Sequence, residues 1–321
     1  MEKVAVTDYA FPSLEIEEAI LKPLGYAVAG GQCTTAAELT ALVADADCVI
    51  TQFARVDAAV IGAMRRARAI IRYGIGVDNV DLDAAAARGI PVCNIPDYCT
   101  DEVADHTLAF ILAAARQVVP HTAGIRAGAW RLAVPLAEMR TLRDMTVGII
   151  GFGRIGREVA ARLAPFKCRT VVHDPAVPAA EVKKLGGEPM ALDALLAASD
   201  LVTLHCPSTA ETKRIINAET IARMRRGAIL VNLGRGDLVD TPALVAALQG
   251  GQLAGAALDV CDPEPIPAGH PLLAMGNVIL TPHIASASPT AVRKLRETAA
   301  NLAALAIRGQ PLPTIVNRVK Q

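Results

Sequence analysis

The sequence predicts an α/β protein of two domains, each built on a doubly wound parallel sheet, with a ligand cleft between them. Strand and helix signals alternate along most of the 321 residues, which is the pattern of βαβ units. A glycine-rich turn joins a short apolar strand to a helix near the middle of the chain. Four later strands each end in a polar residue, and ligands bind at the carboxyl edge of such sheets.

The first hundred residues follow this alternation. Strands are expected at 4–7, 48–50, 69–72 and 91–95, and helices at 36–43 and 57–66. The segment 73–81 follows the third strand and has glycines at 74 and 76, so its backbone N–H groups could hold a carboxylate or another small anion. An ordinary turn, with Asp81 or Asp83 capping the next helix, explains the same residues equally well.

The chain from residue 100 onward predicts a second, longer series of elements. Thr100 is expected to cap a helix that runs to about Val119 and is apolar on most sides, which indicates burial. Strands are expected at 147–150, 169–173, 201–204, 228–232, 254–258 and 278–281, and a closing helix at 289–307. The single tryptophan, Trp130, is expected to anchor a core or an interface. The expected domains are therefore 1–99 with 290–321, and 100–289.

The glycine-rich turn has the form G-x-G-x-x-G and opens a helix. Gly151 permits a tight strand-to-helix turn, Gly153 lets a pyrophosphate approach the backbone, and Gly156 lets the helix pack against the strand. The helix N-terminus adds free N–H groups and a positive dipole end. Together these features predict a Rossmann-like dinucleotide site in 100–289.

An acidic residue in the expected place indicates which dinucleotide binds. Asp174 ends the strand at 169–173, eighteen positions after Gly156, where a carboxylate can accept hydrogen bonds from the adenosine ribose. It would repel a 2′-phosphate, and no arginine follows it directly, so NAD is favoured over NADP. A turn-forming Asp before Pro175 is the structural alternative.

The composition excludes several classes of function. Lysine and arginine number 32, aspartate and glutamate 32, and aromatic residues make up 3% of the chain, which argues against nucleic-acid or anionic-membrane partners. The seven cysteines form no C-x-x-C, and the six histidines show no ligand spacing, so neither a disulfide framework nor a metal site is expected. No signal core or bilayer-length apolar run is present, and a cytoplasmic location is expected.

Three residues after the later strands suit hydride-transfer chemistry. His283 could donate a proton near neutral pH, and a carboxylate such as Glu264 could fix its tautomer. Arg235 could hold a substrate carboxylate and polarise a carbonyl. Taken singly, a satisfied strand-end histidine or a surface-turn glutamate is as plausible, and sequence spacing does not show that the three meet.

Five segments, in order along nearly the whole chain, resemble the D-isomer-specific 2-hydroxyacid dehydrogenase family. They are YGIGVDNVD (73–81), GFGRIG (151–156), LGRG (233–236), ALDVCDPEP (257–265) and LTPHIA (280–285). The resemblance implies catalytic roles for Arg235, Glu264 and His283, and substrate contacts from Ile75, Gly76, Tyr98 and Arg235. It implies cofactor contacts from Gly151, Gly153, Arg154, Ile155, Gly156, Asp174, His205, Cys206, Pro207, Thr212, Leu233, Gly234, Arg235, Asp259 and His283.

The resemblance also implies an activity, a substrate class and an assembly. The expected reaction is hydride transfer between NAD(H) and a small 2-keto or D-2-hydroxy acid, in a homodimer built on the NAD-binding domains. Glu264 differs from the glutamine of formate dehydrogenases, and Thr51 stands where phosphoglycerate dehydrogenases tend to carry a basic residue, although Arg55 is near. Segment 96–100 resembles the branch named after C-terminal-binding co-repressors.

Two other functions stay open at this point. An NAD(H)-sensing module that recruits protein partners could keep the same cofactor site. A dehydrogenase of the same fold could use another hydride donor, because fold and reactive trio together do not name a substrate.

Overall fold

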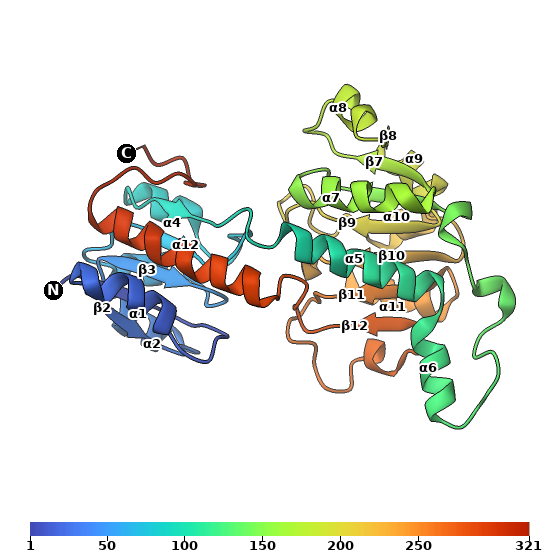
Figure 1. The fold of residues 1–321 in the computed structure, drawn as a ribbon, viewed down its shortest axis with the longest axis horizontal. Coiled ribbons are helices and arrows are strands. Elements are labelled where there is room, and N and C mark those ends of the chain that lie inside the picture. Colours follow the sequence, from blue (N-terminus) through green and yellow to red (C-terminus); the bar gives the residue numbers. More distant parts are fainter. Residues whose placement is uncertain (321) are drawn as a thin grey trace. The chain divides into compact units, whose positions relative to one another are not determined.

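The computed structural model describes residues 1–320 and divides into two compact units (Figure 1). Met1–Tyr98 packs with the chain from Ser288 onward, and Cys99–Ala287 forms the other unit. The expected boundaries differ from these by one or two residues. Cys99 was expected in the first unit but belongs to the second, and Ser288 and Pro289 were expected in the second but belong to the first. The chain thus leaves the first unit, completes the second, and returns to the first.

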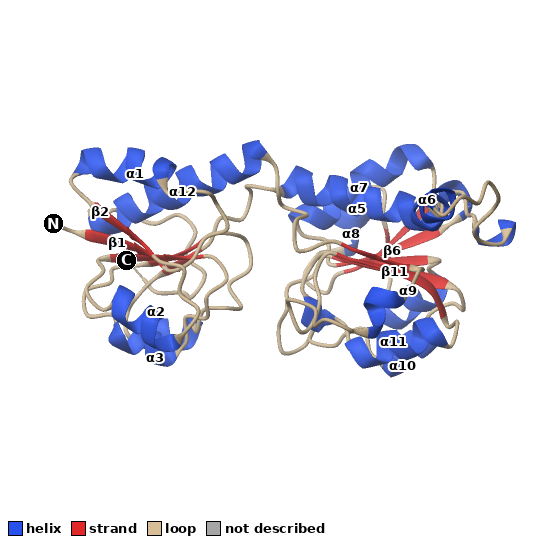
Figure 2. Cartoon of the chain, turned by 90° about the horizontal axis from the view of Figure 1, so that it is seen from below, coloured by secondary structure: helices blue, strands red, loops and turns tan. Residues whose placement is uncertain are grey.

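The first unit is a five-stranded parallel sheet in the order β2-β1-β3-β4-β5, which is the flavodoxin-like order. Its strands are β1 (Lys3–Val6), β2 (Ala27–Gly30), β3 (Cys48–Thr51), β4 (Ile70–Arg72) and β5 (Val92–Cys93). Helices α1 (Glu15–Leu21) and α12 (Pro289–Ile307) cover one face, and α2 (Ala36–Val43) and α3 (Ala58–Ala63) the other (Figure 2). Helix α4 (Leu82–Ala87) adds Ala85 to the core of the α2–α3 face.

Both faces of this sheet are apolar, because successive side chains of a strand point to opposite faces. Val4 and Val6 join the core under α12, whereas Ala5 between them joins the core under α2 and α3. Strands buried on both faces are typical of parallel sheets. This explains why the strands read as short continuous apolar runs in the sequence.

A buried ion pair ties the returning helix α12 to α1. Arg296 donates from Nε and Nη2 to the two oxygens of Glu17 at 2.9 and 2.7 Å. Tyr73 donates from its hydroxyl to the same carboxylate at 2.8 Å. Tyr73 directly precedes the 74–76 loop, so this pair also fixes the start of that loop.

The second unit is a seven-stranded parallel sheet in the order β12-β11-β10-β9-β6-β7-β8. The strands are β6 (Thr146–Ile150), β7 (Arg169–His173), β8 (Glu188–Pro189), β9 (Leu201–Leu204), β10 (Ala228–Asn232), β11 (Leu253–Leu258) and β12 (Val278–Leu280). The strand order reverses between β6 and β9, and ligands bind beside such a switch point. The expected class of two doubly wound parallel sheets is confirmed.

Helices cover both faces of the seven-stranded sheet. Helices α5 (Thr100–Ala115) and α7 (Arg154–Leu163) lie on one face, and α9 (Leu192–Ala198), α10 (Ala218–Arg223) and α11 (Thr241–Gln249) on the other (Figure 2). Helix α8 (Ala179–Lys184) follows β7, and α6 (Val118–Arg126) follows α5. Most expected strands match within a residue or two, whereas strands β2 and β8 and helices α1 and α8 to α11 were not assigned from the sequence.

The helix expected from Thr100 to about Val119 is wrong in two respects. Cys99 is the N-cap and Thr100 the first helical residue, and no side chain caps this end of the helix. Gln117 then takes a left-handed conformation with φ of 55°, which ends the helix and turns the chain into α6 at 64°. No single helix in residues 1–320 is long and apolar enough to cross a membrane, and the bent α5–α6 pair passes by length and composition only.

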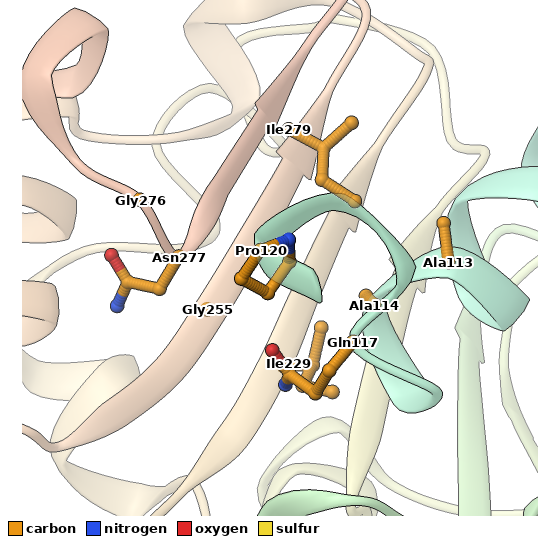
Figure 3. Close-up of a pocket in the computed structure, with 9 residues that line it drawn as sticks. All are labelled: Ala113, Ala114, Gln117, Pro120, Ile229, Gly255, Gly276, Asn277 and Ile279. Carbon is orange, nitrogen blue, oxygen red and sulfur yellow. The ribbon is translucent and has the colours of Figure 1, made fainter. Parts of the chain in front are cut away.

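A small cavity lies where α5 meets α6, beside the first residues of β10, β11 and β12 (Figure 3). Its volume is about 20 Å³, which is room for one water molecule. It is lined by Ala113, Ala114, Gln117, Pro120, Ile229, Gly255, Gly276, Asn277 and Ile279. Because the reactive residues follow the carboxyl ends of the strands, this cavity lies at the opposite edge of the sheet and is separate from the candidate site.

Candidate active site

The glycine turn after β6 meets each of its three expected demands. Gly151 has φ of 93°, and a Cβ there would lie 2.4 Å from the backbone nitrogen of Cys206. At Gly156 a Cβ would lie 2.2 Å from the carbonyl oxygen of Gly151, so only glycine permits this packing. At Gly153, the N-cap of α7, a Cβ would meet no atom within 4 Å. The turn is thus closed on the protein side and open at Gly153, where a phosphate would approach.

Asp174 lies at the end of β7 and is tied to the glycine turn. Its carboxylate accepts hydrogen bonds from the backbone nitrogens of Phe152 at 2.6 Å and Ala176 at 2.8 Å. The acid predicted to meet the adenosine ribose is therefore held beside Gly151 and Gly153. Arg154 and Ile155 form the first turn of α7, which begins at this point.

The loop after β9 packs on the glycine turn through His205 and Cys206. Burial lowers the pKa of His205 to about 3, so its ring is neutral at physiological pH, with Nε2 2.9 Å from Thr203 Oγ1. Burial raises the pKa of Cys206 to about 11, which keeps its thiol protonated. Thr212 donates from its hydroxyl to Pro207 O at 2.6 Å and thereby closes the loop.

Asn232, at the end of β10, shapes the loop that carries Arg235. Its side chain accepts a hydrogen bond from Gly234 N at 3.0 Å and donates one to Arg235 O at 2.8 Å. Leu233 is buried beneath this loop. Arg235 donates from Nη1 to Gly234 O at 2.8 Å, which holds the guanidinium against its own loop.

Glu264 and His283 meet, although 19 residues separate them. Glu264 Oε1 lies 2.5 Å from His283 Nδ1, and Glu264 Oε2 accepts a longer bond of 3.4 Å from Cys261 N. Burial raises the pKa of Glu264, but the hydrogen bond and the charge of His283 lower it by more, and Arg235 adds a smaller lowering effect. The net result is a pKa below the usual value of 4.5. The carboxylate is therefore ionised at neutral pH, and its stabilising effect is lost only as pH falls below about 4.5 through the lower folded-state pKa.

Asp259 holds the turn on which His283 lies. Its side chain is 2% exposed, and it accepts hydrogen bonds from Thr281 Oγ1 at 2.5 Å and from Ile284 N and Ala285 N at 2.9 Å. Its backbone oxygen accepts a hydrogen bond from His283 N at 2.8 Å. The prediction that Asp259 contacts the cofactor stays open, and the structure adds this second role, which sequence reading missed.

Ile75, Gly76 and Tyr98 belong to the first unit. Ile75 O accepts a hydrogen bond from Asn94 Nδ2 at 2.7 Å, which ties the 74–76 loop to the chain after β5. Tyr98 is partly buried against the core under α12. Asp81 is the N-cap of α4 and accepts from Ala84 N at 2.9 Å, so the capping interpretation holds for it. The assignment of Ile75, Gly76 and Tyr98 as substrate contacts stays a prediction.

Thr51 and Arg55 differ in their surroundings. Thr51 is fully buried, with its hydroxyl 3.4 Å from Asp8 Oδ1 and 3.3 Å from Ala54 O. Arg55 is exposed. Of the two residues, Arg55 is therefore the one whose side chain is accessible to an anionic ligand.

The second unit therefore brings several predicted residues to the carboxyl edge of one sheet. The glycine turn, Asp174 and the 205–212 loop form the predicted dinucleotide side, and Arg235, Glu264 and His283 form the predicted reactive side. Asn232, Thr281 and Asp259 organise these loops. Sequence reading missed Asn232 and Thr281, although both lie directly at or after strand ends, which was the available signal.

Comparison with known proteins identifies the family. The family profile "D-isomer specific 2-hydroxyacid dehydrogenase, NAD binding domain" matches residues 108–285. A glyoxylate reductase of Korarchaeum cryptofilum is 43% identical over 82% of this chain and 80% of its own length. The chain belongs to the D-isomer-specific 2-hydroxyacid dehydrogenase family. NAD is the cofactor of the matched domain, and the open face at Gly153 with Asp174 beside it fits that group.

Two further relatives show the range of this family. A D-3-phosphoglycerate dehydrogenase of Mycobacterium leprae is 38% identical over 87% of this chain, but the match covers 53% of that protein. The chain thus spans about half the length of these curated relatives. The crystal structure of a D-lactate dehydrogenase from Aquifex aeolicus, complexed with NAD and lactic acid, has a TM-score of 0.87 at 28% identity, covering 95% of this chain and 96% of the other.

Proposed function

We propose that this protein is an NAD-dependent dehydrogenase that interconverts a small D-2-hydroxy acid and the corresponding 2-keto acid. The observation that carries the proposal is the 2.5 Å contact between His283 Nδ1 and Glu264 Oε1. This contact joins a histidine and a carboxylate at the sheet edge that also carries the glycine turn, which supports their proposed role as an acid–base pair. Neither a binding module nor a structural protein needs a histidine and a carboxylate in that arrangement.

The residues divide the work of the reaction. Bound NADH supplies the hydride for the 2-keto carbon. Glu264 accepts a hydrogen bond from His283 Nδ1–H, so the proton on Nε2 would be the one that passes to the substrate oxygen. The ionised Glu264 also stabilises the protonated imidazole. Arg235, whose positive charge helps to lower the pKa of Glu264, would hold the substrate carboxylate.

The substrate is proposed to be small, like those that name the relatives. Glyoxylate reductases, D-3-phosphoglycerate dehydrogenases and a D-lactate dehydrogenase all match this chain. Their named substrates share a carboxylate next to the reacting carbon. A 2-keto acid therefore supplies both groups that Arg235 and His283 would recognise.

The deciding experiment follows NADH oxidation with glyoxylate, pyruvate, hydroxypyruvate and a phosphorylated 2-keto acid, with NADPH as the comparison cofactor. We expect turnover with at least one acid and a preference for NADH, because the carboxylate of Asp174 would repel a 2′-phosphate. Tight NADH binding without turnover of any acid would contradict the proposal and favour a sensing module. A preference for NADPH would contradict the role of Asp174.

We also propose that the protein is a homodimer that buries the surface of α6 and the loop after it. This surface consists of Val118, Val119, Ile125, Trp130, Leu132 and Leu136, whose exposed fractions are 51, 41, 45, 90, 54 and 71%. Of the two expected places for Trp130, a core or an interface, its exposure excludes the core of the single chain. Exposed apolar side chains gathered on one segment of the chain indicate an interaction surface, and a second copy of the chain is the proposed occupant.

Exchanging Trp130 and Leu136 for glutamate is expected to yield a monomer, because two buried, unpaired charges would face the partner. Light scattering after size-exclusion chromatography gives the mass directly. Leu185→Glu serves as the control, since Leu185 is 44% exposed at the end of α8. A dimer that survives the double substitution, or a wild-type monomer, would refute this surface as the dimer contact.

A further inference from the structure

We propose that His106 on α5 is a positioning residue for the acid–base pair. It acts through Thr281 and Asp259 on the turn that carries His283. This inference rests on the proposed function for its kinetic consequence. Its structural core is a continuous hydrogen-bonded chain within the second unit.

The hydroxyl of Thr281 is the middle link of this chain. Thr281 Oγ1 lies 2.5 Å from Asp259 Oδ1 and 3.2 Å from His106 Nε2. A hydroxyl has one proton to donate, and the buried carboxylate of Asp259 can only accept it. His106 Nε2 must therefore donate to Thr281, so this ring nitrogen carries a hydrogen.

His106 is also held in place from its own helix. Its ring meets that of Phe110, one turn along α5, at 4.6 Å and 64°, an edge-to-face contact. Phe110 is itself buried. The imidazole is therefore directed by packing toward Thr281, rather than being a surface histidine that happens to lie near it.

The turn that carries His283 needs such support. His283 has φ of 55°, a left-handed conformation that is strained for a residue other than glycine. Asp259 compensates by accepting hydrogen bonds from the Thr281 hydroxyl, which precedes His283, and from the backbone nitrogens of Ile284 and Ala285, which follow it. If the Thr281 hydroxyl rotates away from Asp259, the carboxylate can move, and the short His283–Glu264 contact loosens with it.

The test compares His106→Leu, which removes the donor, with His106→Gln, whose amide nitrogen can occupy the place of Nε2 and still donate. The matched change at the next link is Thr281→Val. Thr107→Val is the control, because the buried Thr107 hydroxyl bonds only to Val103 O of its own helix. Two measurements are made on the full chain: steady-state kinetics, and the ¹H–¹³C ring signal of His283 without cofactor. The chain has six histidines, and His283→Asn assigns that signal by its loss.

We expect His106→Leu and Thr281→Val each to lower kcat about tenfold and to leave the KM for the keto acid within about twofold. The His283 signal should shift or broaden in both. His106→Gln should restore both readouts, and the His106→Leu/Thr281→Val double variant should be no worse than either single one, because both break the same chain. Thr107→Val should change neither readout.

An unmoved His283 signal in His106→Leu would overturn the proposal. So would a His106→Gln variant as impaired as His106→Leu, or additive losses in the double variant. If the wild-type protein turns over no 2-keto acid, the proposed function fails, but the His283 signal still decides whether His106 positions that residue.

Discussion

Replacing His283 with alanine is expected to lower kcat by roughly 10²–10⁴ and to leave NADH binding nearly unchanged. The imidazole acts on the substrate oxygen in the transition state, and no other group is assigned to supply that proton. Steady-state NADH oxidation measures the rate, and fluorescence titration with NADH measures cofactor binding. A loss in kcat together with unchanged NADH binding is the signature of an interaction made in the transition state.

Two companion variants sharpen this test. Glu264→Gln keeps an oxygen that can accept from His283 Nδ1 but removes the charge, so its kcat should fall less than that of His283→Ala. His270→Ala removes a histidine whose ring accepts a bond from Leu272 N outside the pair, and it should keep wild-type kcat. Undiminished turnover in His283→Ala would remove this residue from the mechanism.

Gly153→Ala is expected to weaken cofactor binding without loss of stability, whereas Gly156→Ala is expected to lower stability. A Cβ at Gly153 meets nothing within 4 Å, and its φ of −72° suits alanine. Gly153→Ala should therefore fold normally but bind NADH at least tenfold more weakly, because the methyl group occupies the approach of the pyrophosphate. Gly156→Ala should unfold more easily by about 1–3 kcal/mol, since its Cβ would lie 2.2 Å from Gly151 O.

Thermal unfolding and NADH titration separate the two effects. Gly62→Ala is the matched control, because Gly62 lies in α3 of the first unit and its Cβ would also meet nothing within 4 Å. That control should keep both stability and NADH affinity. Wild-type NADH affinity in Gly153→Ala would show that the cofactor does not approach the turn at this glycine.

The strands and the glycine turn could be predicted because their signals are local. A run such as 201–204 is apolar along its whole length, and β9 has those bounds. The break at Gln117 could not be predicted, since glutamine carries no helix-ending signal and the left-handed turn is imposed by the path of the chain. The choice between a core and an interface for Trp130 could not be made from the sequence either, because the 90% exposure of Trp130 is visible only in the fold.

The candidate site shows the same division between local and tertiary information. The three glycines, Asp174 and the reactive trio could each be named from residue type and position at a strand end. The buried ion pair between Arg296 and Glu17, which fixes the start of the 74–76 loop, could not be predicted, because 279 residues separate the partners. The role of Asp259 was also hidden: its carboxylate binds the turn after β12, which becomes visible only when β11 and β12 lie side by side.

The sequence alone therefore determined the class of fold and the dinucleotide turn, and it named NAD and the residues proposed to be reactive. These depend on hydrophobic periodicity and on glycine and charge at fixed local positions. The tertiary structure decided which of these residues meet. Strand order β12-β11-β10-β9-β6-β7-β8 sets the distances along the sheet edge, and spacing in the chain contains no such distance. The His283–Glu264 contact and the His106–Thr281–Asp259 chain exist only once those strands are paired.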